Sequence, residues 1–142
     1  MAEGKIKKSV SIMCFHDELI QVYNALMTAL SLLRAGARVT IYFGAKGINV
    51  VHRDKIGELA CLPDEGDKAG KSVLDKMEEM NLPEVEDLFI MLTAEGATIL
   101  ACPLNMPLFG MKKSDLIDGV EVADPATYYK DVVMKAEINM TF

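Results

Sequence analysis

The sequence predicts an α/β protein in which three layers, α/β/α, are built on a mostly parallel five-stranded sheet. Short runs of β-branched and apolar residues alternate along the chain with segments that repeat apolar residues at helical spacing. The 142 residues, 51% of them hydrophobic, can bury one sizeable core and are too few for two ordinary domains. We therefore expect a single domain over residues 1–142, with Met1–Lys8 as a flexible leader.

The first part of the chain predicts a β-α-β unit. An apolar run at Ser9–Phe15 is typical of a buried strand. Asp17 is a good N-cap for a helix over Glu18–Ala35, and Gly36 is a good residue to end it. Val39–Phe43 is rich in β-branched and aromatic residues, which predicts a second strand parallel to the first.

The middle of the chain alternates between turns and helices. Its expected elements are a turn at Gly44–Gly47, one or two helical turns at Ile48–Arg53, a long loop at Lys55–Lys71, an amphipathic helix at Ser72–Met80, and a helix at Glu84–Glu95 that Gly96 ends. A loop of that length in a small domain is usually functional or disordered.

The last third contains three short strands. Proline and glycine separate the expected elements, which are a strand at Thr98–Ala101, a helical turn at Leu104–Phe109, a strand at Val120–Val122, a helix at Ala126–Lys135 begun by Asp124 and Pro125, and an edge strand at Ile138–Phe142.

Cys102 is the strongest candidate for chemistry. It follows a buried strand and precedes Pro103, and open α/β sheets place their ligands outside the carboxyl ends of the strands. Backbone N–H groups from a turn at Leu104–Phe109 would favour its thiolate. The structural alternative is a buried cysteine that packs as a small hydrophobe, and the residues alone weigh the two readings equally.

Several residues are candidate neighbours of this thiol. Cys14 ends the first strand and would approach Cys102 if the two strands were adjacent, and His16 follows it as a possible base. Gly44 belongs to a turn that could hold an anion, Asn49 could bind an anionic group, and Met106 could line an apolar entrance. Each of them has a plainer role in a turn, on a solvated face or in the core.

Charge and cysteine content exclude several classes. A net charge of −6 disfavours binding to nucleic acid and to anionic membrane surfaces. The most apolar stretch, Leu19–Leu33, is too short and too polar for a membrane span. An odd count of 3 cysteines favours a reducing, cytoplasmic location. No cysteine or histidine spacing matches a zinc site, so we expect no metal, and we expect no cofactor.

Two stretches carry a resemblance to a known family. GARVTIYFGAKGINVVHRD (Gly36–Asp54) and ILACPLNMPLFGMKKSDLIDGVEV (Ile99–Val122) resemble the DsrE/DsrF-like sulfurtransferase family, in its small soluble branch that is labelled peroxiredoxin-like. The expected N-terminal strand and long helix agree with the family in order and length, so the resemblance covers essentially the whole chain. It implies a fold with flavodoxin-like layering and a homo-oligomer.

The resemblance also implies a function. Cys102 would accept sulfane sulfur as a persulfide, and a small sulfur-carrier protein would be its donor or acceptor. Asn105 stands where many relatives carry serine, which is a departure from the family pattern. One alternative is a ligand-binding or regulatory module in which Cys102 is structural. A thiol peroxidase ranks last, because no PxxxTxxC segment precedes Cys102.

Overall fold

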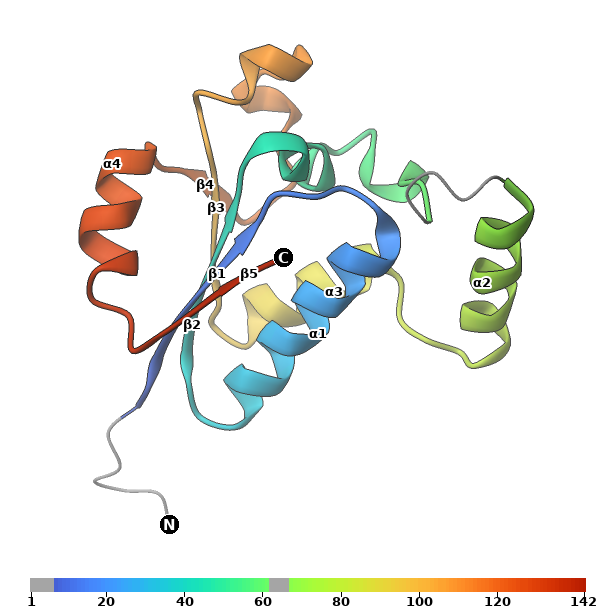
Figure 1. Ribbon diagram of the computed structural model, residues 1–142, viewed down its shortest axis with the longest axis horizontal. Coiled ribbons are helices and arrows are strands. Elements are labelled where there is room, and N and C mark those ends of the chain that lie inside the picture. Colours follow the sequence, from blue (N-terminus) through green and yellow to red (C-terminus); the bar gives the residue numbers. More distant parts are fainter. Residues whose placement is uncertain (1–6, 62–66) are drawn as a thin grey trace.

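The strands form one parallel sheet. The structure is a computed structural model that describes residues 7–61 and 67–142. Within them the sheet has the order β4-β3-β2-β1-β5, and every neighbouring pair is parallel (Figure 1). The strands are β1 (Ser9–Cys14), β2 (Arg38–Phe43), β3 (Thr98–Ala101), β4 (Val120–Val122) and β5 (Ile138–Thr141). The prediction of five strands is confirmed, with β5 at one edge.

Helices cover both faces of the sheet, which confirms the three-layer prediction (Figure 1). One face carries α1 (Leu19–Arg34) and α3 (Val85–Ala94), and the other carries α4 (Pro125–Tyr128), which runs on into a π-helical segment, η5 (Tyr129–Val133). A further helix, α2 (Asp67–Glu79), lies beyond the layer of α1 and α3 (Figure 1). Four short 3₁₀ segments complete the described elements: η1 (Ala45–Val51), η2 (Ile56–Glu58), η3 (Pro107–Phe109) and η4 (Lys113–Asp115).

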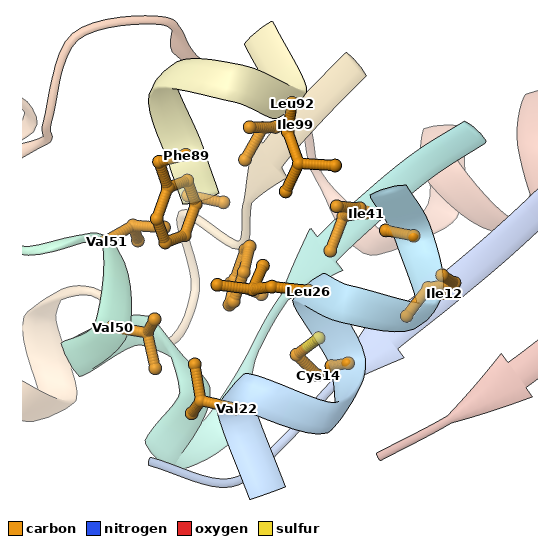
Figure 2. Packing of buried hydrophobic residues seen from close by; sticks show 14 of the residues in the cluster. Ile12, Cys14, Val22, Leu26, Ile41, Val50, Val51, Phe89, Leu92 and Ile99 are labelled. Atoms are coloured by element: carbon orange, nitrogen blue, oxygen red, sulfur yellow. The ribbon is translucent and has the colours of Figure 1, made fainter. Parts of the chain in front are cut away.

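The main core lies between the sheet and the layer of α1 and α3. Successive side chains of a strand point to opposite faces, so alternate residues of β1, β2 and β3 enter it. Figure 2 shows Ile12, Ile41 and Ile99 from these strands packed toward Leu26 of α1 and Leu92 of α3. The intervening strand residues face α4 and form a second, smaller cluster that includes Tyr42 and Leu100.

The ends of α1 show one confirmed prediction and one wrong one. Gly36 ends the helix with φ +101°, and the N–H groups of Gly36 and Ala37 donate to the carbonyls of Leu33 and Leu32, as in a Schellman motif. Asp17, however, is not the N-cap. Glu18 occupies that position without a side-chain cap.

The first turn of α1 is satisfied from a distant part of the chain. The N–H of Leu19 donates to the carbonyl of Ala60 at 2.7 Å, and the N–H of Ile20 donates to that of Cys61 at 3.2 Å. The Asp17 carboxylate is instead bonded to the Asn49 amide. A local capping rule could not anticipate partners that are about forty residues away.

The middle of the chain was predicted with shifted bounds. The helical turns expected at Ile48–Arg53 form η1, which begins at Ala45, so the expected turn at Gly44–Gly47 is partly helical. The helix expected at Ser72–Met80 begins earlier, at Asp67. Gly70 lies inside it, because a single glycine costs a helix only about 1 kcal/mol. Residues 62–66 of the expected long loop, and most of the expected leader Met1–Lys8, lie outside the described residues.

The last third follows the prediction closely. Strands β3 and β4 have the predicted bounds, and Asp124 caps α4 by accepting a hydrogen bond from the N–H of Thr127 at 3.0 Å. The expected turn at Leu104–Phe109 is shorter, with helical geometry only in η3. The helix expected at Ala126–Lys135 begins one residue earlier, and its second half has π-helical hydrogen bonding.

Candidate functional site

Cys102 lies at the carboxyl end of β3, on the face that α4 covers. Its N–H donates to the carbonyl of Phe43 at 2.9 Å, which extends the pairing of β2 and β3 by one residue before Pro103 ends it. Its side chain packs with Tyr42, Leu100 and Tyr128, a group that we call the Cys102 cluster. The residue is only 3% exposed, so the thiol is closed off from solvent in this state.

Two tyrosines form the polar part of the Cys102 cluster. The rings of Tyr42 and Tyr128 stack with centroids 4.0 Å apart and planes 11° from parallel. The Tyr42 hydroxyl donates to the carbonyl of Ala123 at 3.1 Å, and the Tyr128 hydroxyl is hydrogen-bonded to the buried hydroxyl of Ser11. Both phenols therefore have a partner, as buried tyrosines usually do.

The same burial controls how the tyrosines ionise. Desolvation raises the pKa of Tyr128 to about 12. Desolvation also raises the pKa of Tyr42 far above its ordinary value, and the hydrogen bonding and charge of the Cys102 sulfur raise it further. Both hydroxyls consequently stay protonated at neutral pH and keep their capacity to donate hydrogen bonds.

The turn after Cys102 is fixed to the neighbouring loop by Asn105. The N–H groups of Asn105 and Met106 both donate to the carbonyl of Cys102 at 3.3 Å. The side-chain oxygen of Asn105 accepts from the N–H of Ala45 at 2.8 Å, which supports a left-handed residue, since Ala45 has φ +49°. A Cβ atom on Gly44 would lie 3.3 Å from that oxygen, so the two loops approach closely where Gly44 has no side chain.

This turn was expected to favour a thiolate through its backbone N–H groups. The N–H groups of Asn105 and Met106 are bonded to the carbonyl of Cys102, and η3 begins at Pro107, which has no N–H to offer. The phenol of Tyr42 belongs to the same cluster as the Cys102 thiol, and its hydroxyl donates to the carbonyl of Ala123. Cys102 therefore lies just beyond a strand end, as the sequence predicts, but the N–H groups of Asn105 and Met106 are bonded to its carbonyl oxygen and not to its sulfur.

Cys14 does not approach Cys102. Strand β2 separates β1 from β3, and Cys14 faces the opposite side of the sheet, where it packs in the main core near Ile12 and Val22 (Figure 2). Burial raises the pKa of its thiol to about 12. Cys61 is also buried, with a raised pKa, beside the first turn of α1.

The remaining candidates do not gather in one place. Gly44 and Asn105 meet at the carboxyl ends of β2 and β3, next to Cys102. Met106 is buried and packs in the main core. His16 follows β1, with its Nδ1 atom 3.6 Å from a carboxylate oxygen of Glu18. Asn49 bridges Asp17 and Lys55 through its amide, which makes it part of a surface polar network.

The sequence analysis missed Tyr42 and Tyr128 as members of the site. Tyr42 pairs with Leu100 in register, so it shares a face with Leu100 and with Cys102 two residues further on. The alternation of β2, with Val39, Ile41 and Phe43 on one face and Tyr42 on the other, was the available signal. This alternation places Tyr42 beside Cys102 only when β2 and β3 are known to be neighbours in the sheet.

Two further features of the described residues bear on the class of site. No group of three or more histidine, cysteine, aspartate or glutamate side chains there could hold a metal ion. Among the helices of residues 7–61 and 67–142, none has the length and apolar character needed to cross a membrane.

The fold and the site define an α/β protein with a buried thiol at the carboxyl end of an inner strand of a parallel sheet. Comparison with known proteins specifies the class further. The chain belongs to the DsrE/DsrF/DrsH-like family, whose model matches residues 58–141, more than half of its length. This confirms the family resemblance found in the sequence.

One curated relative matches part of the chain. The chain is 32% identical over 66 residues to YrkE of Bacillus subtilis strain 168, an uncharacterized protein, and the match covers 46% of this chain and 39% of YrkE. The chain therefore spans about two fifths of the length of this curated relative.

Two solved structures share the fold. The crystal structure of the YchN protein from E. coli matches with a TM-score of 0.68 and 17% identity, over 96% of this chain and 100% of YchN. The structure of MTH1491, a protein of unknown function from Methanobacterium thermoautotrophicum, matches with a TM-score of 0.61 and 17% identity, over 94% and 99% of the two chains.

Proposed function

We propose that this protein is a sulfur-relay protein that carries sulfane sulfur as a persulfide on Cys102. The observation that carries the proposal is the position of this thiol, at the carboxyl edge of the sheet and beside the phenol of Tyr42. Membership of the DsrE/DsrF/DrsH-like family supports it. Burial raises the pKa values of the two other thiols, and thiolates are the reactive form.

The proposed chemistry is nucleophilic substitution at sulfur. The Cys102 thiolate attacks the outer sulfur of a donor persulfide, R–S–SH, and the S–S bond of the donor breaks. The products are Cys102–S–SH and the thiolate R–S⁻. A thiolate of the acceptor then attacks the outer sulfur of Cys102–S–SH and releases the Cys102 thiolate, so the protein returns to its starting state.

A small sulfur-carrier protein is the proposed donor or acceptor. The net charge of −6 favours a partner with a basic face, because complementary charge accelerates the encounter. We also propose that the protein works as a homo-oligomer in the cytoplasm. Leu104 and Leu108, which are exposed next to the site, offer apolar surface for either kind of contact.

Intact-mass measurement after incubation with polysulfide tests the proposal. The wild type should gain sulfur that a reductant removes, and Cys102→Ser should gain none. Cys14→Ser and Cys61→Ser are matched controls that replace the two other buried thiols, and both should behave like the wild type. Sulfur retained by Cys102→Ser would contradict the assignment.

A second function has one observation in its favour. Cys102 is 3% exposed, and two cavities, of about 730 and 430 Å³, open elsewhere, where α1, α2 and α3 and the residues before β4 line them. A ligand-binding module with a structural Cys102 would have this arrangement. Absence of sulfur on every variant in the same experiment would favour this second function.

A further inference from the structure

Tyr42 lies across the end of β3 in the Cys102 cluster. Its side chain starts on β2, and its hydroxyl reaches the carbonyl of Ala123, just beyond β4. Strand β3 lies between β2 and β4 in the sheet, and neighbouring strands are about 4.8 Å apart. The phenol must therefore pass over β3, on the face of the sheet where the side chain of Cys102 lies.

The surroundings of the Cys102 sulfur are largely apolar, and the buried Ser11 hydroxyl nearby is bonded to Tyr128. Apart from the two tyrosines, the hydrophobic side chains packed in and against this cluster are those of Leu100, Met13, Ala123, Val132 and Val133. A thiolate or persulfide anion in such a place is strongly disfavoured unless a hydrogen bond compensates for the lost water.

Four other nearby donors already have partners. The N–H of Cys102 is bonded to Phe43, and the N–H groups of Asn105 and Met106 are bonded to the carbonyl of Cys102. The hydroxyl of Tyr128 is bonded to Ser11, on the side toward β1. The hydroxyl of Tyr42 donates to the carbonyl of Ala123, and rotation about its C–O bond would direct the same proton toward another acceptor.

We propose that Tyr42 donates the hydrogen bond that stabilises the anionic sulfur of Cys102, an inference that rests on the proposed function. When the thiol loses its proton, the Tyr42 hydroxyl turns from the carbonyl of Ala123 to the sulfur. After sulfur is accepted, the same hydroxyl donates to the persulfide anion. Stacking on Tyr128 holds the ring of Tyr42 in place during both steps.

The ionisation of Tyr42 is consistent with this role. Burial, followed by the hydrogen bonding and charge of Cys102, raises the pKa of the phenol far above its ordinary value. The phenol therefore remains a donor throughout the pH range in which a cysteine thiol ionises.

The rate at which iodoacetamide alkylates Cys102, followed against pH by peptide mapping of the full-length protein, tests the inference. The midpoint of the profile reports the ionisation of the thiol, and the plateau at high pH reports its accessibility. Tyr42→Phe should raise the midpoint by about one pH unit and slow alkylation at pH 7 about tenfold, because a hydrogen bond to the anion is lost.

Tyr129→Phe is the matched control, since it removes a phenol that is 44% exposed and lies outside the Cys102 cluster. Its midpoint should equal that of the wild type. A Tyr42→Phe profile with an unchanged midpoint would overturn the inference, and a change confined to the plateau would do the same, because it would show a role in packing alone.

The alkylation profile does not depend on sulfur transfer, which separates the two proposals. If polysulfide adds sulfur to Cys102 and Tyr42→Phe leaves the midpoint unchanged, the role of Tyr42 fails and the proposed function stands. If no variant gains sulfur and the midpoint still rises in Tyr42→Phe, the proposed function fails and the hydrogen bond to the thiolate stands.

Discussion

Each face of the sheet buries one cysteine, and the side chains around the two thiols differ in polarity. On the face of α1 and α3, Cys14 lies among aliphatic and aromatic side chains from three strands and two helices (Figure 2). On the face of α4, Cys102 lies in a small cluster where two stacked tyrosines and Ser11 place hydroxyl groups inside the protein. Both thiols are buried, so exposure does not distinguish them.

The helical layers on the two faces of the sheet therefore contribute differently to the protein. The large apolar face supplies most of the burial that stabilises the fold, because hydrophobic stabilisation scales with the apolar area removed from water. The small face buries hydroxyl groups, which weaken a core unless every one of them has a partner. We expect substitutions on the first face to change stability without changing the ionisation of Cys102, and substitutions on the second face to change stability less, with Tyr42 alone affecting the ionisation of Cys102.

The largest expected effect is on the face of α1 and α3. Leu26→Ala should lower the free energy of unfolding by about 2–5 kcal/mol, because Leu26 is 0% exposed and its loss leaves a cavity in the main core. The alkylation midpoint of Cys102 should not change. Urea unfolding measures the first effect, with Met27→Ala as control, since Met27 neighbours Leu26 and is 37% exposed. A shifted alkylation midpoint of Cys102 in Leu26→Ala would show that the two faces do not act independently.

The second prediction concerns the hydrogen bond between Ser11 and Tyr128. Ser11→Ala and Tyr128→Phe should each cost about 1–3 kcal/mol, because each leaves one buried hydroxyl without its partner. The double variant should cost less than the sum of the two, since it leaves neither group unpaired. Denaturant unfolding of the four proteins gives this interaction energy, and strict additivity would show that the bond contributes nothing.

The effect that is smallest for a single pH unit is a pH dependence that comes from Cys14. Its pKa is about 12 in the fold against an ordinary value of 9.0, so between these values the unfolded chain binds fewer protons than the native state. The free energy of unfolding therefore falls as the pH rises through this window, by about 1.4 kcal/mol per pH unit from this group. Cys14→Ala should remove that contribution, and curves of equal slope for the two proteins would contradict it.

The sequence predicted elements best where proline, glycine or a cap marks their ends. Strands β3 and β4 have the predicted bounds because Gly96, Pro103 and Gly119 stand near their ends, and Asp124 caps α4 as expected. The N-cap at Asp17 was wrong because carbonyls from a distant segment complete the first turn of α1. Local patterns do not contain such partners.

Only part of the candidate site was predicted, again because local patterns do not contain partners from distant parts of the chain. A strand followed by Cys102 and proline is a local pattern, and the structure places the residue at the carboxyl edge of the sheet. Its neighbours depend on the order of the strands, which brings Tyr42 from β2 and Tyr128 from α4 to this thiol and keeps Cys14 away. No spacing within the sequence reveals that two cysteines at strand ends face opposite sides.

The place of β1 between β2 and β5 also has a consequence for how the chain folds. β2 follows β1 closely along the chain, whereas β5 joins it from far away, and the bond from the N–H of Glu137 to the hydroxyl of Ser9 spans 128 residues. Pairing over such a separation closes a long loop and slows folding. Until β5 arrives, β1 is an edge strand with free N–H and C=O groups, which are templates for pairing with another chain. Docking of β5 therefore covers the exposed backbone of the longer strand β1 and leaves the four-residue strand β5 as the edge.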